Sequence, residues 1–410
     1  MRKNILLNTF GNIFYSLCQW LITIVVVYVE NYEYGAAGIL SLAMTTSSSF
    51  SAISMFSMRS YQISDAKREF SPGQYFSSRI ITCAAALIAC TVAAIPGNTP
   101  FQMICIILFM LIRVAEGFAD VLFGIDQMHD RYGLICASCI LRGGATVVGF
   151  VGGMLLTHDL LITLLVMAVL NLLVVFLFDT RKTFSLESVK IKLKDSELIT
   201  LYRRCLPIVA YTFLLGLVNT IPKTVLQRTS GDDILGIYSS IASPTLIVQV
   251  FASVAFAPII PKLAEFLEKK DYRSFSKFLR LSYLALIGLA AVAMAGAALV
   301  GRAGLVLLFK EDILEYYGLF MPIVMCTILL ACVWILQTIA VTVRRLKTLL
   351  IGMAVDFVIL CLVTYPCIER FGVNGTSYAQ IIVYALMIPF IILICEYDIA
   401  KRKRLEGSGR

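Results

Sequence analysis

Apolar runs of roughly 20 residues recur along the whole chain, and this repetition limits the possible folds more than any other feature. Such runs can cross the hydrocarbon core of a bilayer as helices, where every backbone group must be bonded within the protein. Of the 410 residues, 59% are hydrophobic and 15% are charged, against about 25% charged residues in an ordinary soluble domain. The sequence therefore predicts an all-α membrane protein.

About twelve such runs are separated by polar segments, and they divide into two groups of six. The first six cover residues 8–29, 35–58, 77–95, 101–124, 132–156 and 160–178. The second six cover residues 206–227, 235–260, 281–300, 319–340, 349–365 and 378–395. We therefore predict a six-helix lobe over 1–179, a cytoplasmic linker over 180–205, a second six-helix lobe over 206–400 and a basic cytoplasmic tail over 401–410.

Lysine and arginine residues gather at every second loop, which sets the expected orientation. Most of the 35 basic residues lie at the N-terminus, in the tail, or in the segments 59–79, 181–204, 262–280 and 344–347. Positive residues near span ends are retained in the cytoplasm, so both termini are predicted to be cytoplasmic, in the cell inner membrane. The net charge of +9 then reflects topology and contact with anionic lipids, and no nucleic acid is needed to explain it.

A weak internal repeat relates the two groups of helices. Gly38 near the start of the second span matches Gly236 near the start of the eighth, 198 residues later. Because each group has an even number of spans, both have the same orientation, as in a parallel repeat about an axis along the membrane normal. The linker mixes apolar and basic residues between 185 and 202, which fits either a segment in the membrane interface or a solvated connection.

Two groups of short motifs resemble a known family. Residues 219–223 (NTIPK) and 231–239 (GDDILGIYS) are similar to the seventh helix, the external turn and the entry to the eighth helix of Wzx-type oligosaccharide flippases. Residues 371–378 (FGVNGTSY) are similar to the entry to that family's last helix. These flippases form the polysaccharide branch of the multidrug/oligosaccharidyl-lipid/polysaccharide exporter superfamily. The family often has an aspartate at the position of Ile221, so no ion-coupling role carries over to that position.

The resemblance implies both a fold and a function. The fold is MATE-like, with two six-helix bundles related by pseudo-two-fold symmetry around a cavity that opens alternately to the two sides of the membrane. The function is that of a transporter, which flips a lipid-linked oligosaccharide from the cytoplasmic to the external leaflet. Its partners would be that lipid and the polysaccharide polymerase machinery.

Ionisable side chains within membrane spans are costly and commonly face a cavity or a partner. Arg113, Glu116 and Asp120 are spaced i, i+3 and i+7 in the fourth span, so they share one helix face. Two interpretations are open: a salt bridge between Arg113 and Glu116 that neutralises both, or one wall of a transport cavity. All three residues are candidates for binding substrate.

Arg142 and Arg59 add cations to this set. Arg142 lies about halfway along the fifth span, where it either binds substrate or pairs with Glu116 or Asp120. Arg59, at the cytoplasmic end of the second span, is either a topology anchor or the first contact of the lipid headgroup. Arginine suits a lipid diphosphate because its guanidinium pairs with phosphate oxygens.

Asn219 and Lys223 are the candidates in the seventh span. Pro222 between them interrupts the helical hydrogen bonds and can expose a backbone carbonyl to a cavity. The Asn219 amide suits sugar hydroxyls, or else joins neighbouring helices. Lys223 either lines the cavity or extends to the headgroups.

Asp356 in the eleventh span is the remaining intramembrane carboxylate. Together with Glu116 and Asp120 it is a candidate for binding a proton or sodium ion whose gradient drives transport. Intramembrane charge is balanced on this count, with Arg113, Arg142 and Lys223 against these three carboxylates.

Two other functions compete with a flippase. A MATE-type ion-coupled multidrug antiporter shares the architecture and would favour carboxylates and aromatic residues in its cavity. An integral-membrane glycosyltransferase would need clustered acidic or histidine residues; Asp126, His129 and Asp130 lie together in one loop, but no Walker loop, H-E-x-x-H or nucleophile elbow is present. We therefore expect a protein that is not an enzyme and that uses no cofactor or metal.

Overall fold

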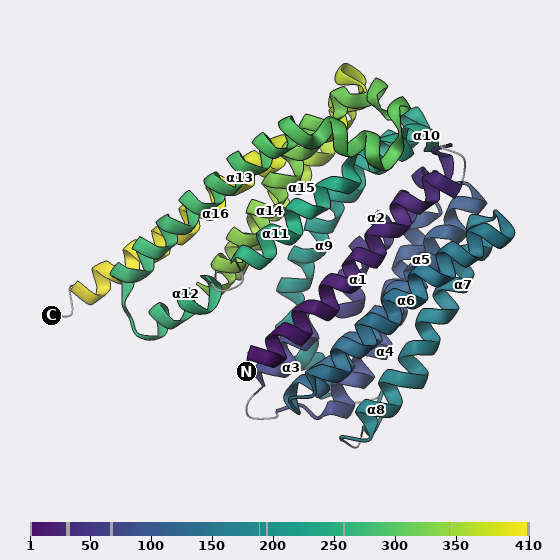
Figure 1. Cartoon of the computed structure of the whole chain (residues 1–410). Coiled ribbons are helices and arrows are strands. Elements are labelled where there is room, and N and C mark those ends of the chain that lie inside the picture. The colour runs from purple at the N-terminus through teal and green to yellow at the C-terminus, as the bar shows by residue number, and fades with distance from the viewer. Residues whose placement is uncertain are drawn as a thin grey trace. The chain divides into compact units, whose positions relative to one another are not determined.

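The computed structural model describes residues 2–29, 33–65, 69–187, 189–193, 196–256, 259–343 and 345–407, and all regular secondary structure within these ranges is helical (Figure 1). Contacts divide the chain into two compact units, residues 1–236 and residues 237–410. The predicted lobe boundaries lie elsewhere, at 179 and 206, and they stay a prediction because contact grouping follows packing and does not test symmetry.

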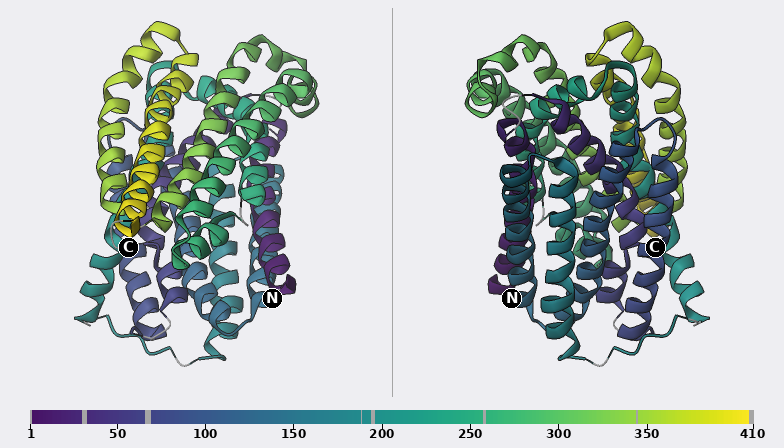
Figure 2. Two further views of the ribbon diagram at one scale, coloured as in Figure 1. Left: turned by 90° about the vertical axis from the view of Figure 1, so that its left-hand side faces the viewer. Right: turned by 90° about the vertical axis from the view of Figure 1, so that its right-hand side faces the viewer.

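The first unit is a bundle in which α1 packs on α6, and α2 packs on α4, α5 and α9 (Figures 1 and 2). Small residues along α2, mostly Ser, Thr, Ala and Gly, allow such close approach between membrane helices. The helices are α1 (Arg2–Val29), α2 (Gly35–Met55), α3 (Met58–Ser64), α4 (Pro72–Ala94), α5 (Pro100–Met128), α6 (Tyr132–Thr157), α7 (Leu160–Leu173), the π-helix η1 (Val174–Asp179), α8 (Thr180–Phe184) and α9 (Glu197–Ser230).

Capping boxes start α4 and α5. Ser71 accepts a hydrogen bond from the backbone N–H of Gln74, the Gln74 side chain bonds back to Ser71, and Pro72 occupies the first helical position. This arrangement fixes a helix start because it satisfies N–H groups that have no partner within the helix. The predicted start of this span, residue 77, is therefore wrong: α4 begins at Pro72.

The second predicted span, 35–58, is broken near its end. Phe56 and Ser57 have φ values of 49° and 51°, a left-handed conformation that stops α2 and lets α3 leave in a new direction. The break frees the Ser54 carbonyl, which accepts hydrogen bonds from Arg79 Nη1 (2.6 Å) and Thr82 Oγ1 (2.9 Å) of α4. The turn between α2 and α3 is thus held by α4.

The two glycines of the internal repeat meet in space. A Cβ atom on Gly38 would lie 1.9 Å from the Asp232 carbonyl oxygen, and one on Gly236 would lie 1.9 Å from the Tyr34 carbonyl oxygen. The offset that matches Gly38 to Gly236 also matches Tyr34 to Asp232, so the contact is reciprocal. A reciprocal contact between equivalent positions is what a two-fold axis produces, and it agrees with the predicted pseudo-symmetry.

The linker between the predicted lobes is partly helical. It contains α8, and α9 begins at Glu197, within the stretch 180–205 that the sequence assigned to the linker. Its described middle lies against the start of α4, where the Lys192 N–H donates to Ser77 Oγ (2.9 Å) and Val189 packs on the core around Phe76. These described residues contact α4, while the side chains of Ile191 and Leu193 are about half exposed.

In the second unit, α14 and α15 pack on α16, and α13 packs on α14. Tyr238 Oη and Ser377 Oγ are 2.9 Å apart, as are Thr245 Oγ1 and Thr327 Oγ1, so buried hydroxyl pairs join its helices. The helices are α10 (Asp232–Ala242, which starts in the first unit), the 3-10 helix η2 (Ser243–Thr245), α11 (Leu246–Phe256), α12 (Ile259–Glu268), α13 (Tyr272–Phe309), the 3-10 helix η3 (Glu311–Leu319), α14 (Phe320–Thr342), α15 (Leu346–Phe371) and α16 (Asn374–Gly407).

Ten helices in the described ranges are long and apolar enough to cross a membrane. Two predicted spans are not among the ten. The span 101–124 corresponds to α5, which has 29 residues but carries charged side chains. The span 235–260 corresponds to α10 and α11, of 11 residues each, separated at the turn that holds Pro244. Several of these helices, such as α13, expose large apolar side chains that suit contact with lipid. Because many such helices follow one another along the chain, it is a multi-pass membrane protein.

Candidate functional site

The three ionisable residues predicted on one face of α5 are held by different neighbours. Arg113 Nη1 donates to both carboxylate oxygens of Glu116, at 2.8 and 2.7 Å, and Arg113 Nη2 donates to Ser48 Oγ of α2 at 3.0 Å. The predicted Arg113–Glu116 salt bridge is therefore present. The two side chains are not equally buried: that of Glu116 is 8% exposed, while that of Arg113 is 16% exposed. Part of the Arg113 side chain is therefore still accessible.

Tyr15 of α1 completes the environment of Glu116. Its hydroxyl donates a short hydrogen bond to Glu116 and accepts one from Gln19 Nε2 at 2.9 Å. Tyr15 and Gln19 continue a polar row on α1 that starts at Asn8 and Asn12, spaced i, i+4, i+7 and i+11. Tyr15 was not among the predicted site residues, because a tyrosine in an apolar helix carries no charge. The three amides of this row, Asn8, Asn12 and Gln19, were the signal in the sequence that could have indicated it.

Arg142 on α6 is buried among aromatic rings. The residue is 4% exposed, and its guanidinium carbon lies 4.7 Å from the Tyr15 ring centroid and 5.4 Å from that of Phe123. Nε and Nη1 have no hydrogen-bond partner among the described residues. Glu116 is near enough to interact electrostatically with Arg142, but no ion pair within 4 Å joins Arg142 to Glu116 or Asp120 among the described residues. The closest described contacts of the guanidinium are aromatic faces, an attraction that is stronger away from water.

Asp120 is paired with arginines from two other helices. Arg79 Nη2 of α4 lies 2.9 Å from one carboxylate oxygen, and Arg59 Nη1 of α3 lies 3.8 Å from the other. Arg59 also donates to the Gln127 side chain at 3.1 Å. Asp120, which has no partner on its own helix, is thus neutralised by tertiary contacts.

Arg79, which the sequence counts with the basic residues near the cytoplasmic ends of the spans, lies two turns inside α4. Its side chain is fully buried, at 0% exposure, between Asp120 and the Ser54 carbonyl. The capping box at Ser71 and Gln74 was a usable signal, because a helix that begins at Pro72 places Arg79 two turns inside.

We define the arginine cluster as Arg59, Arg79, Arg113 and Arg142 together with Glu116 and Asp120. Within this cluster four guanidinium groups face two carboxylates; two further buried carboxylates of the same unit bring the numbers of cations and carboxylates level. These are Asp126 and Asp179, which accept hydrogen bonds from the hydroxyls of Thr183 and Ser138, at 2.9 Å each. The cluster has the chemistry of an anion-binding surface.

The other predicted residues lie on α9 and α15. Asn219 and Lys223 are half-buried on α9, on either side of Pro222, which α9 accommodates without ending. Asp356 is 6% exposed on α15, and its Oδ2 has no hydrogen-bond partner in the part of the chain that the structure describes.

Comparisons with known proteins define the class of fold. No family model matches the chain. The fold is similar to that of an inward-facing multidrug resistance MATE family transporter of the MOP superfamily, with a TM-score of 0.67, 11% identity and coverage of 97% of this chain and 96% of that one. It is also similar to the lipid II flippase MurJ in an inward closed conformation, with a TM-score of 0.64, 11% identity and coverage of 95% and 90%. The predicted MATE-like transporter fold is confirmed.

One relative is informative beyond the fold. The chain is 25% identical over 285 residues to the capsular polysaccharide biosynthesis protein CapF of Staphylococcus aureus, which is 68% of this chain and 70% of that protein. This similarity agrees with the resemblance to Wzx-type polysaccharide flippases that the motifs indicated.

Proposed function

We propose that this protein flips a lipid-linked oligosaccharide from the cytoplasmic to the external leaflet of the inner membrane by alternating access. The grouping of four arginines, from partly exposed to fully buried, in the first unit is the observation that carries the proposal. A lipid diphosphate has strong negative charge, and it needs cations that are held apart from water but not fully neutralised by the protein.

Arg142 and Arg113 meet this requirement in different ways. Arg142 is buried and stacked on two aromatic rings, with two of its nitrogens unbonded within the described chain, so a phosphate oxygen would satisfy donors that are otherwise costly to bury. Arg113 is held by Glu116 yet remains partly exposed, so it can bind a second oxygen without losing its salt bridge. Arg59, which is 22% exposed, would meet the headgroup at the end of α3.

The remaining roles follow from the same function. Asn219 and Lys223 on α9 would bind the sugar and the phosphate. Glu116, Asp120 and Asp356 are the groups that would take up a coupling proton or sodium ion. With both termini in the cytoplasm, the basic loops face anionic lipids, and the external product passes to polysaccharide polymerase machinery.

Transbilayer movement in proteoliposomes tests the proposal directly. The substrate would be a fluorescent polyprenyl diphosphate bearing a short oligosaccharide, and the variants Arg142→Gln and Arg113→Ala. We expect each variant to slow translocation at least tenfold, because each removes a cation that the diphosphate needs. Arg203→Ala is the matched control, since Arg203 is an exposed arginine outside the arginine cluster and its loss should leave the rate unchanged.

Two results would overturn the proposal. One is translocation that is equal in the unmodified protein, Arg142→Gln and Arg113→Ala. The other is no movement of any lipid-linked sugar together with export of a cationic dye, which would indicate a multidrug antiporter. A glycosyltransferase would instead release a new glycosidic product, detectable in the same vesicles by mass spectrometry.

A further inference from the structure

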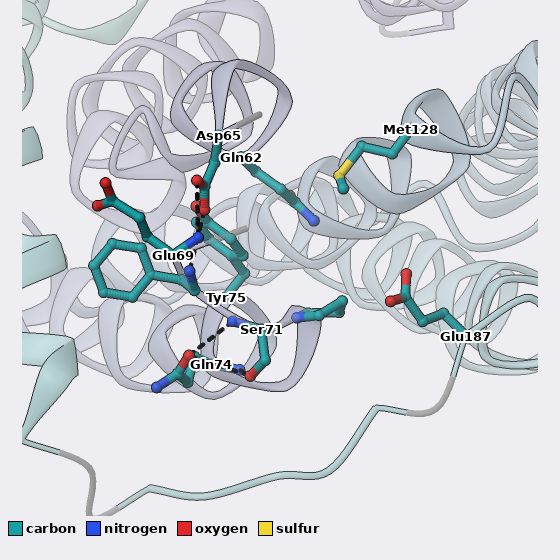
Figure 3. Close-up of a pocket in the computed structure, with 10 residues that line it drawn as sticks. Gln62, Asp65, Glu69, Ser71, Gln74, Tyr75, Met128 and Glu187 are labelled. Carbon is teal, nitrogen blue, oxygen red and sulfur yellow. Dashed lines mark hydrogen bonds between the residues drawn. The ribbon is translucent and has the colours of Figure 1, made fainter. Parts of the chain in front are cut away.

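A cavity of about 360 Å³ lies at one end of the first unit, apart from the stacked rings around Arg142 (Figure 3). Its walls come from the end of α3, the turn into α4, the end of α5 and the linker after α8. The residues lining it are Gln62, Asp65, Glu69, Phe70, Ser71, Pro72, Gln74, Tyr75, Met128 and Glu187. Its volume is within the range of small-molecule sites, which begins at about 300 Å³.

Gln62 is the unexplained group in this cavity. It is 1% exposed, and neither Oε1 nor Nε2 has a hydrogen-bond partner among the residues that the structure describes. Figure 3 shows its side chain extending toward the side of the cavity where Met128 and Glu187 lie. A buried amide without partners costs free energy at both its donor and its acceptor, so the site suits a ligand that both accepts and donates hydrogen bonds.

The polar rim of the cavity is acidic. Asp65 accepts hydrogen bonds from the backbone N–H of Glu69 (2.9 Å), the backbone N–H of Phe70 (3.1 Å) and Tyr75 Oη (3.1 Å). Burial acts to raise the pKa of Asp65, but these bonds act against it, and the pKa lies below its ordinary value. Asp65 is therefore ionised near neutral pH.

Two further carboxylates share this rim. Glu69 pairs with Arg204 at 2.6 Å, and Glu187 lies 3.8 Å from His129 Nε2. Among the described lining residues the ionised side chains are thus carboxylates, which accept strong hydrogen bonds from hydroxyl groups.

Phe70, Pro72 and Met128 form the apolar part of the wall, beside the polar side chains of Ser71, Gln74 and Tyr75. An apolar wall with a few hydrogen-bonding groups suits a ligand with a C–H face and a hydroxyl edge, and a sugar ring has both. We propose that this cavity binds an uncharged sugar unit of the lipid-linked saccharide, an inference that rests on the proposed function.

The place of the cavity fits the order of groups in such a lipid. Arg59 and Gln62 are spaced i, i+3 on α3, so they are neighbours on one helix face. Arg59 reaches Asp120 of α5, while Gln62 packs against Gly124, one turn further along α5. A diphosphate at Arg59 would place its first sugar about one helical turn away, roughly 5 Å, at the Gln62 cavity.

Equilibrium binding of two probes to the purified full-length protein in detergent tests the inference. One probe is a polyprenyl diphosphate, and the other is the same lipid bearing one N-acetylglucosamine. We expect the unmodified protein to bind the sugar-bearing probe about tenfold more tightly, the equivalent of about 1.4 kcal/mol. Gln62→Met removes the amide at similar volume, and Met128→Trp fills the cavity from the opposite side. With either variant the two probes should bind with about equal affinity. The affinity for the lipid without sugar should not change.

Gln227→Met is the control, because Gln227 is a buried glutamine of α9, 8% exposed, whose Nε2 donates to Asp232 outside the cavity. It should keep the tenfold preference. Thermal unfolding separates a binding effect from misfolding: Gln62→Met replaces an unpartnered polar group by an apolar one, so its melting temperature should not fall.

The possible failures are distinguishable. If the unmodified protein binds the two probes equally and Gln62→Met changes neither affinity, the sugar site is wrong while the proposed function stands. If Gln62→Met weakens both probes equally, Gln62 acts through Arg59 or the fold, and the sugar site is again wrong. If the unmodified protein binds neither probe, the proposed function itself fails.

Discussion

Both units are helical in their described residues, but their interiors differ. The first contains the arginine cluster, in which buried charges are cross-linked between helices. In the second, the buried ionisable groups described are Asp356, whose Oδ2 has no partner there, and Asp398, which pairs with Arg345 and Arg402 near the end of α16. The two units thus differ in the charges that they bury, and under the proposed function the first unit would be the one that recognises the anion.

If buried charges hold the helices of the first unit together, the largest loss of stability is expected on substitution of Arg79. Arg79→Met should lower the free energy of unfolding by about 3 kcal/mol or more, because it leaves the Asp120 carboxylate and the Ser54 carbonyl without this partner in a buried place. Chemical unfolding in detergent measures it. Arg79→Met combined with Asp120→Asn should recover part of the loss; no recovery would show that Arg79 acts by packing alone, and a wild-type stability of Arg79→Met would contradict the burial of this pair.

The reciprocal glycine contact predicts a matched pair of effects. Gly38→Ala and Gly236→Ala should each lower the free energy of unfolding by about 2 kcal/mol, since each Cβ would meet a backbone carbonyl that cannot move alone. Gly152→Ala on α6 is the control: its Cβ meets open space, and alanine should raise stability by about 0.5 kcal/mol or slightly more. Clearly unequal losses at positions 38 and 236 would argue against the two-fold relation.

The next prediction concerns Asp356, the buried carboxylate of the second unit whose Oδ2 has no described hydrogen-bond partner. Asp356→Asn should change the free energy of unfolding by less than about 1 kcal/mol, or raise it, because it removes a carboxyl group with an unsatisfied oxygen and breaks no ion pair. If Asp356 binds the coupling ion, translocation by this variant should no longer respond to an imposed proton or sodium gradient, while the unmodified protein responds. Transport that remains gradient-dependent in Asp356→Asn would remove this residue from ion coupling.

The smallest effect concerns pH at the sugar cavity. The pKa of Asp65 is below its ordinary value, which is about 4, so Asp65 is ionised from pH 6 to pH 8. Its contribution to folding and to sugar binding is present above that ordinary value and is lost as pH falls through the lower folded pKa. The preference for the sugar-bearing probe should therefore be flat between pH 6 and pH 8. A preference that changes severalfold in this window, and that becomes flat in Asp65→Asn, would contradict the assigned ionisation of Asp65.

Part of the candidate site was predictable and part was not. The Arg113–Glu116 pair follows from i, i+3 spacing alone, since one helix brings the two side chains together. The buried state of Arg79 could have been predicted from the capping box at Ser71, because the box sets the helix start. The pairing of Asp120 with Arg79 and Arg59 was not predictable, because it depends on which faces of three helices meet.

The sequence by itself determined the membrane class, nearly all of the spans and the family resemblance. The reason is that the bilayer acts on each segment separately, through its length, apolarity and flanking charge. Only the tertiary structure decided which charges meet, that Arg142 is stacked between Tyr15 and Phe123, and that a cavity encloses the Gln62 amide. These outcomes depend on helix rotation and on the break at Phe56 and Ser57, which are set by packing between helices.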